Sequence, residues 1–401
     1  MVADGSTARR VAAYEAFAEG RLQEAQGLLD AELEASGSDF QLLNDLAVVA
    51  FRLGRTDLSQ AYFQQAQQLR MAQDGLLIGN LIDALAGVKP QAAVGEAARQ
   101  PVSGEASDGH FARWLADSAS ALHTKARQSS DEVWAAALYA SVDGEAFHDH
   151  LLPAFIDCET QRVFVGSSGV PALQEADRFI RVLLGQLNKH GLALTDASVA
   201  VDFGSGWGRY TRFMLKYVHP DNLYGLEVSP QMVEHCRKAF GMANFLKVDS
   251  MPPCPLRSGM VDLIFGYSVF SHLAPHCADA WVDEFARITQ AGGLVLMTTQ
   301  GRSFIEFCRQ VRESGDRSHP WFVSLAKAFV DTDQAYRDYD AGQMLHFGEG
   351  QYGGTYGESL IPHGYIESHW GKYFDLVDFI DDRGVLPQAL FVLRRKDVPY
   401  V

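Results

Sequence analysis

Residues 201–209 read Val201-Asp202-Phe203-Gly204-Ser205-Gly206-Trp207-Gly208-Arg209, and this stretch decides the fold. It begins as a hydrophobic strand, and its glycines then stand at the alternate positions 204, 206 and 208. Because glycine has no Cβ, the backbone can turn tightly there and a ligand can lie against it. A helical run from Tyr210 to Tyr217 would present its unpaired N–H groups to that ligand. We therefore predict a strand, a ligand-binding turn and a helix.

The spacing of the glycines separates two classes of nucleotide-like ligand. A dinucleotide fingerprint requires its third glycine at the position of Arg209. The Gly-x-Gly-x-Gly form of Gly204, Gly206 and Gly208 instead resembles motif I of class I S-adenosylmethionine (SAM) methyltransferases. This resemblance implies a Rossmann-like fold with SAM as cofactor and S-adenosylhomocysteine as product, and it disfavours an NAD oxidoreductase.

From residue 198 onward, short apolar segments alternate with helical ones, which is typical of a parallel α/β sheet. The last two apolar segments are separated only by a short turn region, 381–388, which predicts an antiparallel hairpin at a sheet edge. A seven-stranded sheet that ends in such a hairpin resembles the class I methyltransferase fold. The expected strands are 199–203, 223–227, 245–248, 263–267, 294–298, 376–380 and 389–393.

Ligands of open α/β sheets lie beyond the carboxyl ends of the strands. Glu227 ends the second strand, about 20 residues after the glycines as in nucleotide-binding folds, where a carboxylate can accept both ribose hydroxyls. The resemblance implies that Asp249 accepts from the adenine amino group and that the backbone at Ser250 meets the ring. It further places the methionine part of the cofactor beside Tyr267 and Ser268. The complete expected cofactor set is Asp202, Gly204, Ser205, Gly206, Trp207, Gly208, Arg209, Glu227, Val228, Asp249, Ser250, Met251, Tyr267 and Ser268.

Methyl transfer to a neutral hydroxyl or amine needs a base and an aligned acceptor. His272 is the first candidate because it follows the fourth strand, and the alternative is a histidine that only lines the pocket or caps a helix. Tyr352 and His363 are further catalytic candidates, within and just after an aromatic, glycine-rich insertion at 301–362. His276 lies four residues after His272, but Pro275 intervenes, and we predict no metal site.

The first hundred residues predict paired helices that repeat. The segment 17–21 (Phe-Ala-Glu-Gly-Arg) recurs as 51–55 (Phe-Arg-Leu-Gly-Arg), an offset of 34 residues. A helix–turn–helix period of this length resembles the tetratricopeptide repeat. An ordinary helical hairpin bundle is the alternative, because the Trp and the terminal Pro of the family pattern are missing.

The expected domains are a repeat domain at 1–100, a connector with a weak helix at 101–130, and a methyltransferase domain at 131–401. The insertion at 301–362 is either a lid over the acceptor or a surface that packs on the N-terminal helices. The repeats are expected to hold a partner, a second copy of the chain or the substrate.

Bulk composition narrows the partners and the location. The chain has 401 residues with 47% hydrophobic and 21% charged residues, which predicts two or three globular domains. Its formal net charge of −16 argues against a nucleic-acid partner. Five scattered cysteines and the absence of an apolar leader or membrane-length apolar stretch predict a cytoplasmic protein with reduced thiols and no membrane partner.

The leading functional hypothesis is a SAM-dependent methyltransferase acting on a hydroxyl, or an amine, of a saccharide or other small metabolite in a biosynthetic pathway. A peptide or protein acceptor held by the helical repeats is the first alternative. A catalytically inactive SAM-binding scaffold is the second.

Overall fold

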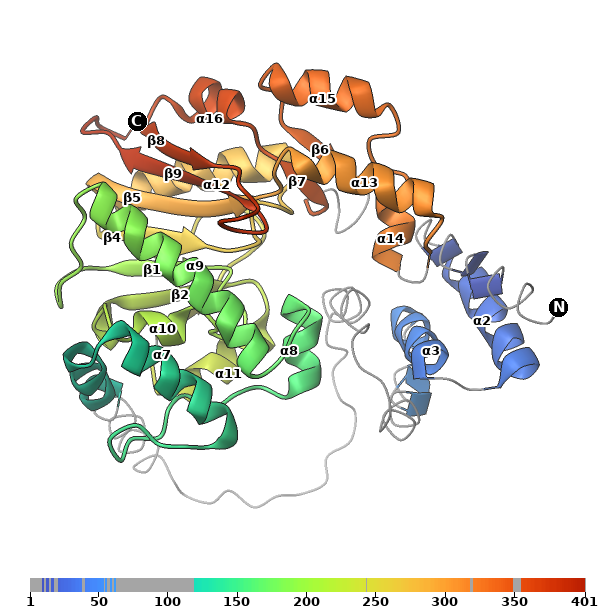
Figure 1. Cartoon of the computed structure of the whole chain (residues 1–401), viewed down its shortest axis with the longest axis horizontal. Coiled ribbons are helices and arrows are strands. Elements are labelled where there is room, and N and C mark those ends of the chain that lie inside the picture. The colour runs from blue at the N-terminus through green and yellow to red at the C-terminus, as the bar shows by residue number, and fades with distance from the viewer. Residues whose placement is uncertain are drawn as a thin grey trace. The chain divides into compact units, whose positions relative to one another are not determined.

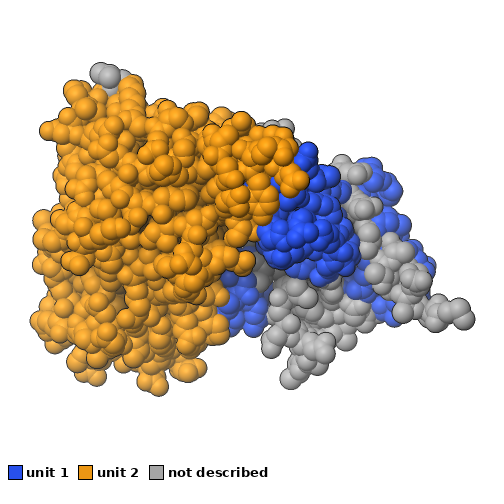
Figure 2. Space-filling model, turned by 45° about the horizontal axis from the view of Figure 1, so that its top comes forward, with its two compact units in different colours: residues 1–93, 157–168, 305–332 blue, residues 94–156, 169–304, 333–401 orange. Residues whose placement is uncertain are grey.

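The computed structural model describes two compact units of the chain (Figure 2). Unit 1 comprises residues 1–93, 157–168 and 305–332, and unit 2 comprises 94–156, 169–304 and 333–401. The described residues are 9–10, 12–13, 16–17, 21–37, 40–53, 55, 58–59, 61–62, 119–242, 244–317, 320–348 and 355–400.

Unit 2 is built on the predicted seven-stranded sheet, with strand order β3-β2-β1-β4-β5-β9-β8. Figure 1 shows the strands following one another from β2 through β1, β4, β5 and β9 to β8. The first five strands pair in parallel, whereas β9 runs antiparallel to both β5 and β8. The mostly parallel α/β sheet is therefore confirmed. Its strands are β1 (Ala200–Phe203), β2 (Leu223–Glu227), β3 (Phe245–Lys247), β4 (Val261–Gly266), β5 (Thr289–Thr299), β8 (Phe374–Ile380) and β9 (Ala389–Arg395).

Alternate side chains of the strands enter one large apolar cluster on a single face of the sheet. Val201 and Phe203 of β1 belong to this cluster, whereas the intervening Asp202 faces the other way, as the two-residue period of a strand requires. Helices α12 (Pro275–Ile288) and α16 (His363–Trp370) cover this face with aromatic and aliphatic side chains. Helix α11 (Pro230–Phe240) connects β2 to β3, and its N-terminus is capped by the Ser229 hydroxyl, which accepts from the Met232 N–H.

One helix of unit 2 differs from its predicted length, because the helix expected over 210–217 is only α10 (Thr211–Met214). Helix α7 (Asp131–Ala140) is followed by a 3₁₀ turn at Ser141–Asp143, which ends at Gly144 in the left-handed conformation. Helix α9 (Val170–Lys189) is amphipathic and buries its apolar stripe.

Unit 1 contains the front helices α2 (Leu22–Ser36) and α3 (Phe40–Arg52), together with α8 (Cys158–Val165) and α14 (Pro320–Leu325). Two pairs of hydrogen bonds recur at the 34-residue offset seen in the sequence. The Arg21 N–H donates to Ala16 O (2.8 Å) and the Arg55 N–H to Ala50 O (2.9 Å). Likewise, Arg21 O accepts from the amide of residue 25 and Arg55 O from that of residue 59, each at 3.0 Å. The helical character of this region is confirmed.

The insertion at 301–362 is divided between the two units. Residues 305–332, with α14 and most of α13 (Ser303–Ser314), belong to unit 1. The remainder of the insertion belongs to unit 2 with the sheet, and it includes α15 (Thr332–Asp340) apart from its first residue, β6 (Leu345–Phe347) and β7 (Glu358–Leu360). The insertion therefore does not belong to a single compact unit.

Among the described residues, no helix combines the length and the apolar character needed to cross a membrane.

Candidate cofactor and catalytic site

The glycine turn is fastened to the end of β2. The backbone N–H groups of Gly204 and Ser205 both donate to Leu226 O, at 2.8 and 3.1 Å. Gly204 has φ +72° and Gly208 has φ +78°, in the left-handed region that favours glycine. A Cβ on Gly204 would lie 2.4 Å from Val269 Cγ2, and one on Gly208 would lie 2.5 Å from the Phe240 ring. Neither position therefore accepts a larger residue.

Glu227 links this turn to the next strand end. Its Oε2 accepts from the Gly206 N–H and its Oε1 from the Ser229 N–H, both at 2.8 Å. Glu227 is 5% exposed, and burial raises the pKa of its carboxyl. Each carboxylate oxygen has a second lone pair. Glu227 can therefore shape the turn and still accept a ribose hydroxyl.

Asp202 lies behind the turn and is completely buried. Its Oδ2 accepts from the Thr211 hydroxyl at 2.5 Å, while its Oδ1 has no hydrogen-bond partner among the described residues. Burial raises the pKa of Asp202 to about 7, although the Thr211 hydrogen bonds oppose this shift. A carboxyl with an unsatisfied oxygen next to the turn favours a nearby cationic or hydrogen-bonding ligand.

The predicted contacts at the ends of β2 and β3 are open to a ligand. Val228 is 55% and Met251 is 37% exposed, and the side chain of Asp249 is 79% exposed beside Lys247. The Trp281 indole N–H donates to Ser250 O at 2.9 Å and holds the backbone there. An exposed rim around the buried Glu227 and Asp202 carboxyls fits a nucleoside with polar hydroxyls.

The side chains of Trp207 and Arg209 are both buried. Trp207 lies beside Phe155, with ring centroids 6.1 Å apart, and Arg209 pairs with Glu175 of α9 at 3.2 Å and with the Tyr210 hydroxyl. The Arg209 side chain therefore links the turn to α9, which leaves its backbone for a contact with the cofactor. Tyr267 packs edge-on against Phe179 of α9 at 5.2 Å, and burial raises the pKa of Tyr267 to about 12.

His272 lies beyond the carboxyl end of β4 and is partly buried. Its Nδ1 is 2.8 Å from Gly357 O, its Nε2 is 3.4 Å from the Ser268 hydroxyl, and its ring stacks on Tyr356 with centroids 4.8 Å apart. Ser268 has φ +60°, an uncommon conformation for a non-glycine residue that often marks functional sites. The predicted partners Ser268 and His272 are thus brought together.

The other two catalytic candidates remain predictions. His363 begins α16, where its side chain is 57% exposed and its Nε2 lies 3.5 Å from Glu367 Oε1. Tyr352 lies outside the described residues.

Three residues around His272 were not among the site residues predicted from the sequence: Thr298, Glu358 and Gln388. Thr298 ends a predicted strand and Gln388 ends the predicted turn, so both stood at strand ends that signal a site. Glu358 Oε1 lies 3.8 Å from His272 Nδ1, although the two residues are far apart in the sequence. No motif connects them.

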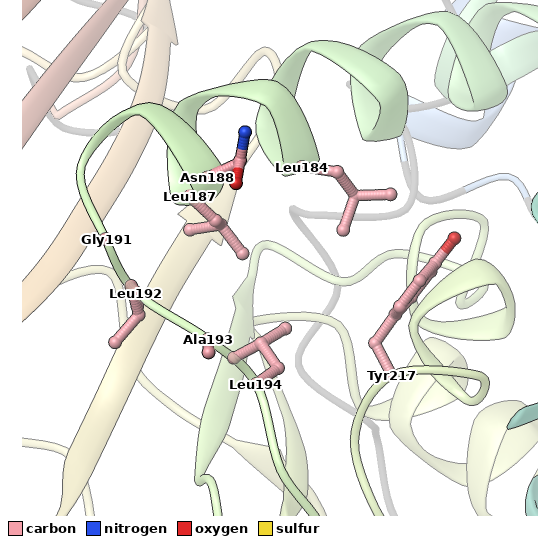
Figure 3. Close-up of a pocket in the computed structure, with 8 residues that line it drawn as sticks. All are labelled: Leu184, Leu187, Asn188, Gly191, Leu192, Ala193, Leu194 and Tyr217. Carbon is pink, nitrogen blue, oxygen red and sulfur yellow. The ribbon is translucent and has the colours of Figure 1, made fainter.

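A cavity of about 330 Å³ lies elsewhere in unit 2 (Figure 3). Figure 3 shows Leu184, Leu187 and Asn188 of α9 facing the 191–194 loop and Tyr217. That loop precedes β1, so the cavity lies toward the amino ends of the strands, away from the glycine turn. It is not the cofactor site.

Comparison with known proteins bears on this site directly. Residues 200–293, from β1 into β5, match the family model for the methyltransferase domain. No protein of curated function matches the chain. Within the part of the chain that the structure describes, no group of three or more His, Cys, Asp or Glu side chains is arranged to hold a metal ion.

Solved structures of methyltransferases are also similar to this chain at a low level. A SAM-dependent methyltransferase from Anabaena variabilis is 13% identical, with a TM-score of 0.37 over 67% of this chain and 96% of that chain. One from Clostridium acetobutylicum is 10% identical, with a TM-score of 0.36 over 56% of this chain and 91% of that chain. Such weak likeness carries no information on the acceptor.

Proposed function

We propose that this chain, an enzyme with a methyltransferase domain and SAM as its cofactor, transfers the methyl group to a hydroxyl, or an amine, of a saccharide or other small metabolite in a biosynthetic pathway. We further propose that His272 is the general base. The same domain model that identifies the methyltransferase residues spans both the glycine turn and His272.

The role of His272 is supported by the hydrogen-bond partners of its two ring nitrogens. A carbonyl oxygen only accepts hydrogen bonds, so Nδ1 at 2.8 Å from Gly357 O carries a proton. In the neutral ring, Nε2 is then an acceptor, and it faces a hydroxyl, that of Ser268, at 3.4 Å. A substrate hydroxyl that takes this place would donate to Nε2 in the same way.

The chemistry divides between cofactor and protein. Bound SAM supplies an electrophilic methyl group on its sulfonium. The glycine turn and Glu227 would hold the nucleoside, with Val228, Asp249, Ser250 and Met251 around the adenine side. His272 would take the proton of the acceptor hydroxyl at Nε2 as the methyl group passes from the sulfonium sulfur to the acceptor oxygen, which would leave S-adenosylhomocysteine as the neutral thioether. Gly357 O would keep the ring in place. Alignment of the acceptor with the methyl group and a general base within reach of its proton each accelerate methyl transfer strongly.

The test is methyl transfer by the full-length enzyme. Methyl-labelled SAM is incubated with an extract of the native cell, separated into a small-molecule and a macromolecular fraction. We expect label in the small-molecule fraction, and a loss of turnover of about 10²–10⁴-fold in His272→Ala. SAM affinity, measured by calorimetry, should stay unchanged in this variant.

His276→Ala is the matched control, because His276 is exposed and lies four residues away. It should retain full turnover. Label only in the macromolecular fraction would replace the small-molecule acceptor by a peptide or protein acceptor. Binding of SAM without any labelled product would favour the scaffold alternative.

For the front of the chain we propose tetratricopeptide-like repeats over residues 1–100, in a protein that works in the cytoplasm. The recurrence of the same backbone hydrogen bonds at the 34-residue offset supports this assignment. Such a domain would hold a protein partner, a second copy of the chain or a peptide acceptor. A peptide acceptor is the second candidate function, and the macromolecular fraction of the extract tests it.

A further inference from the structure

We propose that Glu358 is a positioning residue for His272, and that its carboxylate keeps the proton on Nδ1 so that Nε2 stays free to accept. This inference rests on the proposed function, in which His272 is the base. It deepens that function by naming a residue from a distant part of the chain that controls which ring nitrogen can react.

Strand β7 is held tightly beside the end of β4. The Gly357 N–H donates to His272 O at 2.7 Å, and the Ser359 N–H donates to Ser271 O at 2.7 Å. On its other side, Ser359 O accepts from the Gln300 N–H at 3.1 Å. Glu358 is therefore clamped by the backbone between two residues that bond to the His272 segment and to the end of β5.

The carboxylate of Glu358 has a defined orientation. Oε2 accepts from the Gln300 side-chain amide at 3.0 Å, which leaves Oε1 at 3.8 Å from His272 Nδ1. Glu358 is 8% exposed, so the surrounding dielectric screens this attraction less than water would. A negative charge on this side favours a proton on Nδ1, and it would stabilise the imidazolium after proton transfer.

On the opposite side of the ring, His272 Nε2 faces the Ser268 hydroxyl, which a set of hydrogen bonds holds in place. Thr298 Oγ1 accepts from the Ser268 N–H at 2.7 Å and donates to Gln388 Oε1 at 2.7 Å. The Gln388 amide then donates to Ser268 Oγ at 3.0 Å. Ser268 Oγ thus accepts from Gln388 and has one proton to donate. The two nearest partners for this proton are Ser271 Oγ at 3.3 Å and His272 Nε2 at 3.4 Å.

Both sides of the ring therefore specify the same tautomer, with a proton on Nδ1 and a lone pair on Nε2. Among the described residues, the titratable groups on β6, on β7 with the residues just before it, and on the segment after β4 that carries His272 are Glu358, Tyr356, His346 and Tyr267. His346 is turned to another partner, since its Nδ1 is 2.8 Å from the Ser359 hydroxyl. Glu358 is the one acidic group of this set.

Glu358→Gln tests the proposal sharply. The new amide oxygen can keep the bond from Gln300, and its NH₂ then occupies the place of Oε1. Two donors would face each other, the amide NH₂ and the Nδ1–H. Gly357 O still accepts from the Nδ1–H at 2.8 Å. We therefore expect the Nε2–H tautomer, in which Nε2 can no longer accept a proton, to become populated beside the Nδ1–H form.

The readout is the tautomer of His272, observed by NMR in the full-length chain with ¹⁵N-labelled histidine. The signals of His272 are assigned by their disappearance in His272→Ala. The wild type should show the Nδ1–H form alone, and Glu358→Gln should show a mixture of the Nδ1–H and Nε2–H forms. An unchanged tautomer in Glu358→Gln overturns the proposal.

Glu367→Gln is the matched control, because Glu367 faces His363 at 3.5 Å in the same type of pair. It should leave the His272 signals unchanged. If Glu358→Gln does not fold, Glu358→Asp retains the charge at a greater distance and should give a mixture of tautomers. A fully Nδ1–H ring in that variant would equally contradict the proposal.

Turnover provides a second and separate readout. Glu358→Gln should lower kcat at least tenfold, while SAM affinity and the KM for the acceptor stay near the wild-type values. The tautomer measurement needs neither cofactor nor acceptor. A tautomer shift without any methyl transfer by the wild type would therefore refute the proposed function and leave the role of Glu358 intact.

Discussion

Asp202 shows how burial acts on a single residue of the site. Burial raises its pKa from the usual 3.8 to about 7, so the folded protein holds a proton that the unfolded chain has already released. Between these two values, rising pH therefore favours the unfolded chain. The stability that protonated Asp202 contributes is complete below pH 3.8 and is lost as the pH rises through about 7.

We expect Asp202→Asn to remove this pH dependence. The free energy of unfolding of the wild type should fall by about 1–4 kcal/mol between about pH 5 and about pH 8, relative to that of the variant. Urea unfolding followed by tryptophan fluorescence at the two pH values measures the difference. Asp249→Asn, at an exposed site, is the control and should follow the wild type. Parallel curves for wild type and Asp202→Asn would show that Asp202 does not titrate in this range.

Single residues were predictable from sequence where a backbone motif fixes them. Gly204, Gly208 and Glu227 lie where the motif placed them, because glycines in a tight turn and an acid at a strand end have few structural alternatives. Arg209 belonged to the same motif, but its long side chain reaches Glu175 on α9. Side-chain direction depends on packing from distant parts of the chain, which the local sequence does not encode.

At the scale of elements, β7 carries Glu358 and is attached to the segment that contains the proposed base His272. It pairs with β6 and also bonds to the segments after β4 and β5. We expect Ser359→Pro to detach β7, because proline removes the N–H that donates to Ser271 O. His272 would then lose the Gly357 carbonyl and the nearby Glu358 carboxylate.

Hydrogen exchange measures this effect directly. In Ser359→Pro the amides of β6 and β7 should exchange much faster, whereas those of β1 and β4 should keep their protection. Methyl transfer should fall as far as it does in His272→Ala. Ser359→Ala retains the N–H and is the control, although it loses the Oγ bonds to His346 and Leu273 O. Equal loss of protection in all strands of Ser359→Pro would mean that β7 is part of the sheet core.

Strands with a clear apolar pattern in the sequence were predicted, whereas a strand without one was not. The apolar runs of β1, β2 and β4 are buried throughout or nearly so, and their sequence predicted them to within two residues. Strand β7 was not predicted, because Glu358-Ser359-Leu360 is short and carries two polar residues. It is a strand only because neighbouring backbones provide partners for its N–H and C=O groups.

At the scale of the whole molecule, each compact unit has an apolar core of its own among the described residues. In unit 2 such a core lies between the sheet and helices α12 and α16, and in unit 1 one lies among the front helices around Ala16, Leu29 and Leu46. Each core belongs to one of the two compact units. The 34-residue repeat predicted paired helices at the front of the chain, and packing on these helices was one of the two alternatives for the insertion at 301–362. The structure groups residues 305–332 of this insertion with the front helices in unit 1. That segment carries no repeat pattern, and only its tertiary contacts assign it.

Two cores predict two unfolding transitions in calorimetry, each responding to a different perturbation. SAM at about 100 times its Kd should stabilise only the transition of unit 2, by about 2.7 kcal/mol, since a ligand stabilises the unit that binds it. Leu46→Ala, at a completely buried position of unit 1, should lower only the other transition, by about 2–5 kcal/mol. Leu151→Ala is the control, because Leu151 is 79% exposed, and should shift neither transition. If SAM and Leu46→Ala moved the same single transition, the two units would unfold as one cooperative body, and damage to the front helices would reach the catalytic site through loss of folding.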